Sequence, residues 1–449
     1  MTGELIPPSP AEIEGRSQAA QSRWRPYPEY KDSGIEWLGE IPAGWDVKRL
    51  KFLTRCLDGQ RIPLNSEERG EMQGDIPYWG ANGILDRVDR WLFDEPLVLL
   101  GEDGAPFFDK NKNVAFFVSD KVWVNNHIHA LRPNQAIKPK LLMHCLNCVD
   151  YKIFIDGSTR DKLTQSDMNS IQIPIIQSIS EQENIIKYLD RETAKIDALI
   201  EKKRRLISLL EEKRAAVISH AVTKGLDPDA PMRDSGVEWL GEIPTGWNLL
   251  QLRRVINKFV DYRGATPKKV PNGIPLITAK NIKMNKIDFE LSQEFIREED
   301  YNSWMVRGLP EIGDVLVTTE APLGESAQIV DPNIALAQRI ILLKADKVRI
   351  TNDYLKYYFA SSSGKSELWS RATGSTALGI KASRFKETLL TVPPIKEQQM
   401  ITELLDRETL KSYKLVSKIN EQINKLQEYR TALISAAVTG KIDVREASL

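Results

Sequence analysis

Short polar segments in both halves of this 449-residue chain combine glycine with amide, hydroxyl, basic and aromatic side chains. In the major groove of duplex DNA, Arg and Lys pair with guanine edges, and Asn and Gln pair with adenine edges. Ser and Thr hydroxyls and the backbone N–H groups of loops donate to phosphate oxygens. The chemistry that these segments suit is therefore contact with the bases and phosphates of DNA.

The candidate DNA-contacting residues form one set in each half of the chain. The first set is Gln60, Arg61, Tyr78, Asn82, Asn125, Asn126, His127, Ser158, Thr159 and Arg160. The second set is Arg263, Thr266, Lys268, Lys280, Asn281, Gln338, Arg339, Ser375, Thr376 and Lys381. Ordinary turns use the same residue types, so turn chemistry explains any single loop equally well. The Gly-Ser-Thr segments at 157–159 and 374–376 recur at nearly the same distance before a helical segment, which favours a function for both.

Neither a catalytic motif nor a strong metal motif is found. The chain has no GxxxxGK[ST] phosphate loop, no GxSxG motif and no GxGxxG that opens a helix. His144, Cys145 and Cys148, with His127 and His129 upstream, resemble a metal site. A lone CxxC is a weak signal, and the neighbouring leucines indicate that these cysteines are buried small hydrophobes. We expect no catalytic residue and no metal on this chain, which disfavours a metal-dependent enzyme.

The composition is that of a globular protein with balanced charge. There are 62 Lys and Arg residues against 62 Asp and Glu residues, and 41% of the residues are hydrophobic. Proteins that bind DNA alone are often basic, because phosphate neutralisation drives their affinity. We therefore expect local basic patches, or a partner that supplies charge. With three cysteines, no secretory signal and no long apolar run, a soluble cytoplasmic protein is expected.

An internal repeat organises the chain. Residues 32–45 read DSGIEWLGEIPAGW, and residues 234–247, 202 positions later, read DSGVEWLGEIPTGW. A second pair, EQENIIKYLDRET at 181–193 and EQQMITELLDRET at 397–409, is separated by 216 positions. The regions between these copies show little similarity, and the second is 14 residues longer. The repeated scaffold is therefore expected to carry two different variable regions.

Each second copy opens a long helix. Apolar residues recur in three- and four-residue steps from Glu181 to about Thr223, with Ser180 as the expected N-cap and Glu183 completing a capping box. The other helix is expected from about Ile395 to Val438, and Gly225 and Gly440 mark the two ends. The region between the helices begins where one ends and finishes where the other begins, so the helices should be antiparallel.

Polar residues interrupt the two helical stripes at different places. In the 216-residue alignment Lys203 corresponds to Ile419, and Leu206 corresponds to Gln422. This indicates that the helices pack as unlike partners in a coiled coil, although Lys203 and Lys213 could instead extend their charged ends to solvent. The basic run 202–205 is interpreted as a solvated helix face.

The anchor residues and the variable regions complete the predicted fold. Five apolar residues of the first anchor are expected to pack the domain onto the helix pair, or else to bind a partner protein: Trp37, Leu38, Ile41, Pro42 and Trp45. Strands are predicted at Leu97–Leu100, Val114–Val118, Ile171–Ile176, Leu276–Thr278, Val315–Thr318 and Ile340–Leu343. The predicted class is α+β, with two globular mixed α/β domains separated by two long antiparallel helices in a pseudo-two-fold repeat.

From Tyr30 onward the sequence resembles the DNA-specificity subunits of type I restriction–modification systems. The resemblance lies in the duplicated DSGxEWLGEIPxGW, in EQxxIxxxLDRET, in the proline-containing entries to both helices and in the endings AVTKGLD and AVTGKID. It implies an N-terminal extension (1–29), recognition domain 1 (30–176), helix 1 (177–226), recognition domain 2 (227–394), and helix 2 with a tail (395–449).

The resemblance also implies a function and partners. Each domain would read one half of an asymmetric bipartite site in duplex DNA, and the helices would set the gap. The subunit would be non-catalytic and would recruit two methyltransferase subunits, which use S-adenosylmethionine, and restriction/translocase subunits, which use ATP and Mg. A specificity subunit of a modification-only or other restriction assembly, and a non-catalytic coiled-coil interaction scaffold, remain as alternatives.

Overall fold

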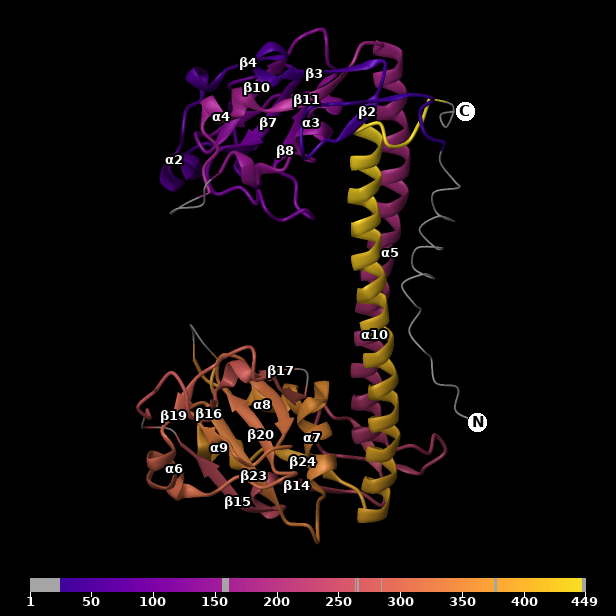
Figure 1. The fold of residues 1–449 in the computed structure, drawn as a ribbon. Coiled ribbons are helices and arrows are strands. Elements are labelled where there is room, and N and C mark those ends of the chain that lie inside the picture. Colours follow the sequence, from indigo (N-terminus) through magenta and orange to yellow (C-terminus); the bar gives the residue numbers. More distant parts are fainter. Residues whose placement is uncertain are drawn as a thin grey trace. The chain divides into compact units, whose positions relative to one another are not determined.

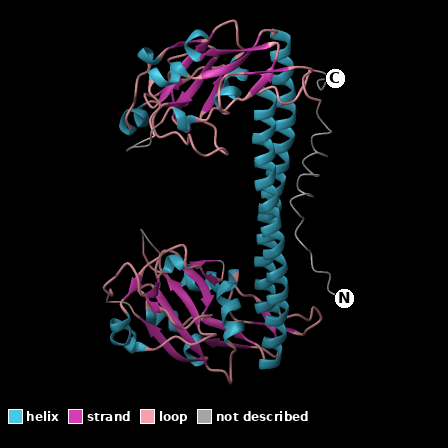
Figure 2. Ribbon diagram, viewed as in Figure 1, coloured by secondary structure: helices cyan, strands magenta, loops and turns pink. Residues whose placement is uncertain are grey.

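The computed structural model describes residues 25–155, 161–262, 264, 266–283, 285–374 and 378–445. These residues form two compact units: unit 1 contains the chain up to Lys203 and from Glu421 onward, and unit 2 contains Arg204–Asn420. The division falls inside both long helices, so each unit contains part of each helix (Figure 1). Both units mix helices and strands (Figure 2), in agreement with the predicted class.

Unit 1 is built on a four-stranded antiparallel sheet in the order β4-β10-β7-β8. Its strands are β1 (Tyr30–Asp32), β2 (Glu40–Pro42), β3 (Trp45–Arg49), β4 (Thr54–Cys56), β5 (Gln73–Gly80), β6 (Gly83–Val88), β7 (Leu97–Gly101), β8 (Ala115–Val118), β9 (Trp123–Val124), β10 (Ile128–Pro133) and β11 (Gln172–Ile176). Its short helices are α2 (Ser66–Glu71), α3 (Pro139–Leu146) and α4 (Gln165–Ser170). A second sheet has the order β6-β5-β9, and β1 pairs with β2 and β3 with β11.

Unit 2 repeats this arrangement with the four-stranded sheet β15-β23-β20-β21. Its strands are β12 (Met232–Asp234), β13 (Glu242–Pro244), β14 (Asn248–Gln251), β15 (Ile256–Asp261), β16 (Ile274–Ile277), β17 (Ile282–Lys283), β18 (Lys286–Ile287), β19 (Phe295–Ile296), β20 (Val315–Thr319), β21 (Leu323–Gln328), β22 (Ala335–Leu336), β23 (Ile340–Ala345) and β24 (Leu389–Val392). Its short helices are α6 (Glu298–Trp304), α7 (Asn352–Ala360), α8 (Ser362–Ser370) and α9 (Ala382–Lys386).

The repeat therefore extends through the regions whose sequences differ. In both units the middle strand of the three-stranded sheet pairs antiparallel on one side and parallel on the other, at β5–β9 and β16–β22. The six predicted strands are confirmed within one or two residues at each end. Unit 2 adds the β17–β18 hairpin between β16 and β19, where two residues join β5 to β6 in unit 1. The two variable regions thus share one fold and differ in their loops.

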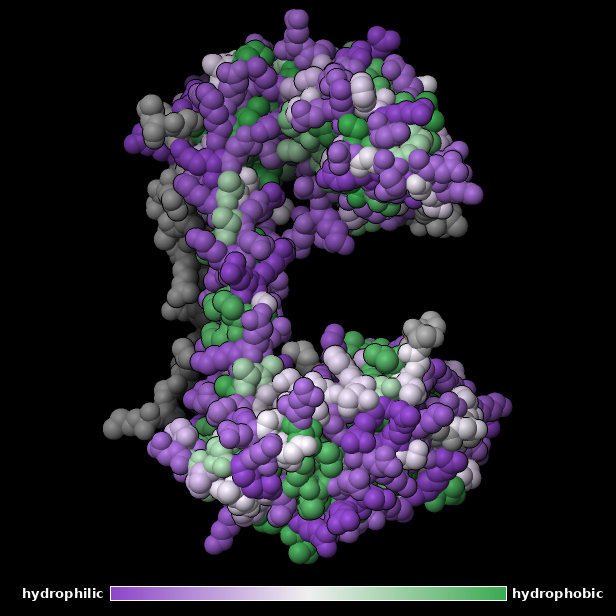
Figure 3. Space-filling view, turned by 180° about the vertical axis from the view of Figure 1, so that it is seen from behind, coloured by the Kyte–Doolittle hydropathy of each residue, from purple (hydrophilic) through white to green (hydrophobic). Residues whose placement is uncertain are grey.

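The long helices are α5 (Ile179–Lys224) and α10 (Ile395–Val438), close to the predicted bounds. In unit 1 they are antiparallel, because Arg430 pairs with Asp197 at 2.9 Å while Lys203 Nζ donates to Gln422 at 2.7 Å. Lys203 is therefore matched with a polar partner, as expected for unlike helices. No helix among the described residues is long and apolar enough to cross a membrane. The visible face is mostly hydrophilic, with small separate hydrophobic patches (Figure 3).

The predicted cap of α5 is wrong by two residues. The helix begins at Ile179, and Ser178 Oγ, rather than Ser180, accepts from a backbone N–H of the first turn, that of Glu181 at 3.3 Å. The Glu183 carboxylate does not close a capping box and instead pairs with Lys138 Nζ at 2.7 Å. Two serines separated by one residue both suit a cap, and their local sequence does not distinguish between them. Gly225 and Gly440, with φ of +83° and +73°, follow the helix ends as predicted.

The anchors pack onto the long helices, as predicted. In unit 1 the indole N–H of Trp45 donates to Glu181 Oε1 at 3.1 Å, and in unit 2 Trp247 donates to Glu397 Oε2 at 3.0 Å. Each tryptophan also lies against the glycine that follows the opposite end of the other long helix, Gly440 for Trp45 and Gly225 for Trp247. Each anchor therefore joins the start of one long helix to the end of the other.

A buried glutamine beside each of these glutamates joins the helix to its domain. The Gln182 side chain donates to Ala136 O and Ile176 O and accepts from Lys138 N–H at 2.8 Å. Gln398 donates to Arg349 O and Pro393 O and accepts from Thr351 N–H, also at 2.8 Å. Both side chains are fully buried, so the repeated Glu-Gln pair is explained by these contacts.

Replacing Gln182 with Ala should lower the free energy of unfolding of unit 1 by about 3 kcal/mol, because three buried backbone groups lose their partner. Gln398→Ala should do the same to unit 2. Urea unfolding of the full chain, combined with hydrogen exchange resolved to each unit, measures both effects. Gln399→Ala is the matched control, since Gln399 is exposed and should change little. Equal losses in all three variants would contradict this explanation of the Glu-Gln pair.

Candidate nucleic-acid interface

Predicted residues of unit 1 meet at one end of the four-stranded sheet. The β9–β10 loop, the segment after β7 and residues 161–163 are joined by bonds from Glu102 N–H to His127 O (3.0 Å) and from Leu163 N–H to Glu102 O (2.7 Å). Arg61, after the 3-10 helix η2 (Asp58–Gln60), donates to Ile128 O at 2.9 Å. These connections define loop cluster 1, which consists of residues 58–61, 102–104, 125–127 and 161–163.

Unit 2 has an equivalent cluster at the equivalent end of its sheet. Gln338 Nε2 donates to Thr266 Oγ1 at 2.7 Å, and the N–H of Thr319 donates to Arg339 O at 2.8 Å. The N–H of Ile380 donates to Thr319 O at 3.0 Å, and Arg339 lies 3.6 Å from a carboxylate oxygen of Glu320. Residue 266 and residues 319–320, 338–339 and 378–380 form loop cluster 2.

Most of the predicted residues in these clusters have accessible side chains. Gln60 and Asn126 are exposed in cluster 1, where His127 is half-buried, and Asn82 is exposed in the neighbouring β5–β6 turn. Thr266 and Arg339 are exposed in cluster 2, where Gln338 is half-buried; Lys268 and Lys381 are exposed just beyond it in the chain. The two clusters thus occupy matching places but carry different donors and acceptors.

Three predicted residues have buried side chains that serve the domain itself. The fully buried Tyr78 accepts from Leu64 N–H at 2.9 Å, and the buried Asn125 accepts from His127 N–H at 2.5 Å. Fully buried Asn281 donates to the carbonyls of Asp288 and Ser292, both at 2.9 Å, as the last residue of η5 (Ala279–Asn281). Buried polar groups need such partners, so these residues brace loops and are not available to bases.

Arg61 and Lys280 also depart from the simple prediction. Arg61 is mostly buried and pairs with Glu102 at 2.7 Å, which commits its guanidinium to cluster 1. Lys280 is exposed but lies outside cluster 2, in a cleft beside Arg214 of α5.

Six predicted residues lie outside the described residues: Ser158, Thr159, Arg160, Arg263, Ser375 and Thr376. Described neighbours of both Gly-Ser-Thr segments belong to the clusters. The N–H of Gly104 donates to Asp161 O at 3.0 Å, and Gly379 forms a bridge with Glu320.

The acidic residues that brace the clusters were missed by sequence reasoning. Asp58, Glu102 and Glu320 hold basic or histidine side chains in place, but nothing in their spacing distinguishes them from other surface carboxylates. The acidic residue that the sequence repeat does single out is the glutamate of the Glu-Gln pair, and that residue belongs to the scaffold rather than to a loop cluster.

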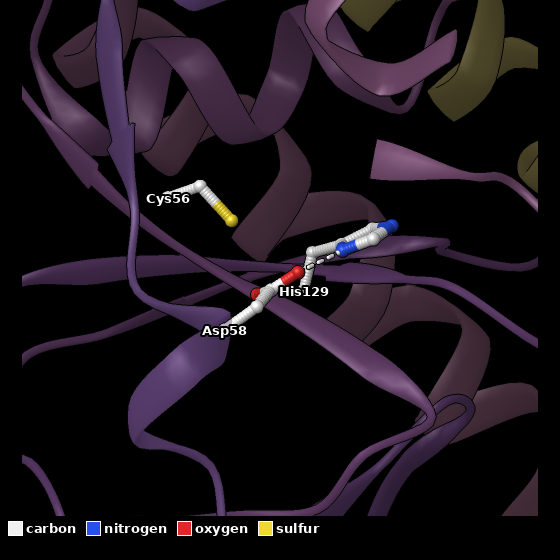
Figure 4. A group of neighbouring side chains, drawn as sticks. All are labelled: Cys56, Asp58 and His129. Atoms are coloured by element: carbon white, nitrogen blue, oxygen red, sulfur yellow. Dashed lines mark hydrogen bonds and ion pairs between the residues drawn. The ribbon is translucent and has the colours of Figure 1, made fainter. Parts of the chain in front are cut away.

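The predicted metal-like residues do not gather into one site. Among the described residues, the one group with metal-ligand spacing is Cys56, Asp58 and His129 (Figure 4). Cys145 is buried among the leucines of α3, as predicted, whereas Cys148 is only half-buried; His144 of the same helix is buried as well. Burial lowers the pKa of His144 to about 4 and raises the pKa of Cys148 to about 12.

The Cys56–Asp58–His129 group is internally satisfied. His129 Nδ1 faces Asp58 Oδ2 at 2.5 Å, and Nε2 lies 3.0 Å from Leu163 O, a pure acceptor, so Nε2 carries a proton. The other oxygen of Asp58 accepts from Ala130 N–H at 2.9 Å, and Arg61 approaches the carboxylate to 3.4 Å. Burial raises the pKa of the Cys56 thiol to about 11. With every polar atom of Asp58 and His129 partnered, this group fits a loop brace better than a metal site.

Burial favours the neutral form of Asp58, but hydrogen bonds from His129 and Ala130 and the charge of Arg61 outweigh it and lower the pKa below 3.8. The carboxylate therefore stabilises the fold above that pH, and the contribution is lost as the pH falls through the lowered pKa. Asp58→Ala should cost about 3 kcal/mol near neutral pH, because Arg61, the buried His129 ring and the Ala130 N–H lose their carboxylate partner. The difference from the wild type in urea unfolding should shrink in acid. Asp75→Ala, at an exposed carboxylate, should show neither effect.

Comparisons with known proteins agree with these observations. The family model described as the type I restriction modification DNA specificity domain matches residues 42–209 and 244–425. A Haemophilus influenzae protein, named as a candidate specificity subunit of a type I restriction enzyme, is 26% identical over 83% of this chain and 91% of its own. The MjaVIII specificity subunit of Methanocaldococcus jannaschii is 22% identical over 93% of this chain and 97% of its own.

A solved structure supports the same fold. A chain from a study of complex assembly and conformational transition of the type I restriction–modification system has a TM-score of 0.56 and 17% identity. The match covers 89% of this chain and 98% of that chain. Each family match includes one copy of EQxxIxxxLDRET, at 181–193 and 397–409, whereas the anchors at 32–45 and 234–247 begin before the matches. The chain therefore belongs to the type I restriction–modification DNA-specificity family.

Proposed function

We propose that this chain recognises duplex DNA for a type I restriction–modification enzyme, with each unit reading one half of an asymmetric bipartite site. The observation that carries the proposal is the pair of loop clusters, equivalent in place and different in residues, on one repeated fold. A repeated scaffold with identical loops would suit a symmetric target. Loops that differ, as these do, suit two unlike half-sites.

The exposed residues of each cluster suggest how the readout differs. Asn126 and Asn82 in unit 1 offer amides of the kind that bind an adenine edge, whereas Arg339 in unit 2 offers the guanidinium preferred by guanine. Arg61 and Glu102 form a neutral pair within cluster 1, which keeps the Glu102 carboxylate from repelling phosphates. The clusters therefore combine polar readers with internally neutralised braces.

The two long helices are proposed to set the gap between the half-sites. Both helices continue from one unit into the other, and each anchor ties a domain to the start of one helix and the end of the other. Shortening either helix alone would break the antiparallel register seen at Asp197 and Arg430.

The subunit is proposed to act without chemistry of its own. Two methyltransferase subunits would bind S-adenosylmethionine and methylate adenine, and restriction/translocase subunits would use ATP and Mg. The family assignment and the neutral charge of this chain support this division of labour. A partner that contributes basic surface would complete DNA binding.

Exchanging residues 54–173 with the equivalent region of a relative should change one half of the recognised site and leave the other half intact. The exchange replaces cluster 1 but keeps the anchor and the Glu-Gln pair. Sequencing of methylated adenines in cells that carry the chimaera gives both halves directly. Changes in both halves would refute the assignment of one domain to one half-site. DNA binding without sequence preference would favour a scaffold function.

Deleting residues 201–207 together with 419–425, which face each other in the antiparallel pair, should shorten the gap and leave both half-sites unchanged. Seven helical residues span roughly 10 Å and a base pair about 3.4 Å, so the gap should lose up to about three base pairs. The same methylation map reports gap and half-sites separately. Deletion from α5 alone is the control and should abolish modification. A gap of normal length in the double deletion would contradict the proposal that the helices set the gap.

A further inference from the structure

A strongly basic cleft lies in unit 2 outside loop cluster 2. Its volume is about 660 Å³, and it lies between α5 and the segment that leads into the β17–β18 hairpin. Four basic side chains line it, Arg214, Lys280, Lys283 and Lys365, against one acidic side chain, Glu325. Glu325 is paired with Lys365 at 2.5 Å, so it does not neutralise the other three.

The partner of Arg214 leaves its charge in place. The guanidinium lies 4.9 Å from the centre of the Tyr413 ring, and Lys286 Nζ lies 4.5 Å from the same ring. An aromatic face attracts a cation but carries no net charge to cancel it. Two cations are therefore held at one ring beside the cleft, an arrangement that an anion would stabilise.

The repeat shows that this charge excess is particular to unit 2. In the 216-residue alignment Arg214 corresponds to Arg430, and Tyr413 corresponds to Asp197. In unit 1 this pair is a salt bridge, Arg430 with Asp197 at 2.9 Å. One difference between the copies, tyrosine for aspartate, turns a neutralised arginine into an unneutralised one.

The matching cleft of unit 1 has balanced charge. It is about 580 Å³ in volume and is lined by Glu428, Thr431 and Ala432 of α10, at positions that correspond to the Arg214 region of α5. Three basic residues, Lys110, Lys112 and Lys152, face three acidic ones, Asp109, Asp150 and Glu428. The two clefts adjoin corresponding stretches of the long helices but differ in charge.

We infer that the cleft lined by Arg214, Lys280 and Lys283, with Lys286 beside it, binds backbone phosphates of DNA next to the half-site read by unit 2, and that the unit 1 cleft does not. This inference rests on the proposed function. Lysines are point charges suited to phosphates without base readout. Lys280 and Lys283 are exposed, and no ion pair among the described residues engages Lys280, Lys283 or Lys286. In a chain of zero net charge, such an excess concentrates phosphate affinity on one side of the target.

The test measures the salt dependence of binding to a cognate duplex by the complex of this chain with its methyltransferase subunits. Each neutralised phosphate contributes about 0.9 to the slope of log affinity against log salt. Lys280→Gln with Lys283→Gln should make the slope shallower by about two, with the methylated sequence unchanged. Tyr413→Asp, which reproduces the arrangement of unit 1, should make it shallower by about one. Lys110→Gln with Lys112→Gln in the unit 1 cleft is the matched control and should change the slope little.

The outcomes separate this inference from the proposed function. If the wild-type complex shows no sequence-selective binding, the proposed function fails. If it binds selectively but the unit 2 variants keep the wild-type slope, only the cleft assignment fails. Equal changes in the two clefts would refute the asymmetry. Loss of complex assembly, with an unchanged slope for the complex that remains, would overturn the phosphate assignment in favour of an acidic segment of a partner subunit.

Discussion

The hydrogen bond from an anchor tryptophan to the first turn of a long helix is the contact on which the rest of the fold depends. Trp45 with Glu181 and Trp247 with Glu397 place each domain at a helix start, where a carboxylate is also favoured by the helix dipole. The same indole rings lie against Gly440 and Gly225, the residues that close the opposite helix ends. Lys441 and Lys224 then donate to the backbone carbonyls of Glu40 and Glu242. Neither helix can be extended or shifted without disturbing a domain.

Sequence periodicity and repetition were sufficient for the scaffold. Local residue patterns predict the helix bounds and the six strands, and the order of the segments along the chain predicts the antiparallel direction of the helices. Ser178 caps the helix in place of the expected Ser180, and Glu183 pairs with Lys138 of another segment rather than closing a capping box. The similarity of the two variable regions was not accessible from the sequence. Many different combinations of apolar residues can fill the core of an antiparallel sheet with the same strand order. The two units can therefore share a fold although their sequences differ.

The candidate site was harder to predict, for a physical reason. A loop residue that braces and a loop residue that reads need the same chemistry, a hydrogen-bonding side chain on an irregular backbone. Asn125 and Asn126 are neighbours of the same type, yet Asn125 is buried against the backbone of His127 and Asn126 is exposed. Burial depends on contacts between distant segments, as Tyr78 and Asn281 also show. The local charge of a surface is equally hard to predict from the sequence, because a basic residue such as Arg61 can be neutralised by an ion pair in the fold.

The alternation of buried bracing residues and exposed loop residues bears on how two copies of one fold can carry different surfaces. Replacing an exposed side chain such as Asn126 removes no internal bond, whereas replacing its neighbour Asn125 leaves a backbone N–H without its partner. Exposed loop residues can therefore change one at a time at little cost in stability, whereas buried bracing residues must change together with the groups they hold. Asp58 and His129 bond through their side chains in unit 1, whereas Ile341, which is the second residue of β23 as His129 is of β10, has an apolar side chain that cannot form such a bond. The two units have thus kept the strand order and solved the bracing of their loops separately, and this freedom allows one scaffold to carry two unlike surfaces.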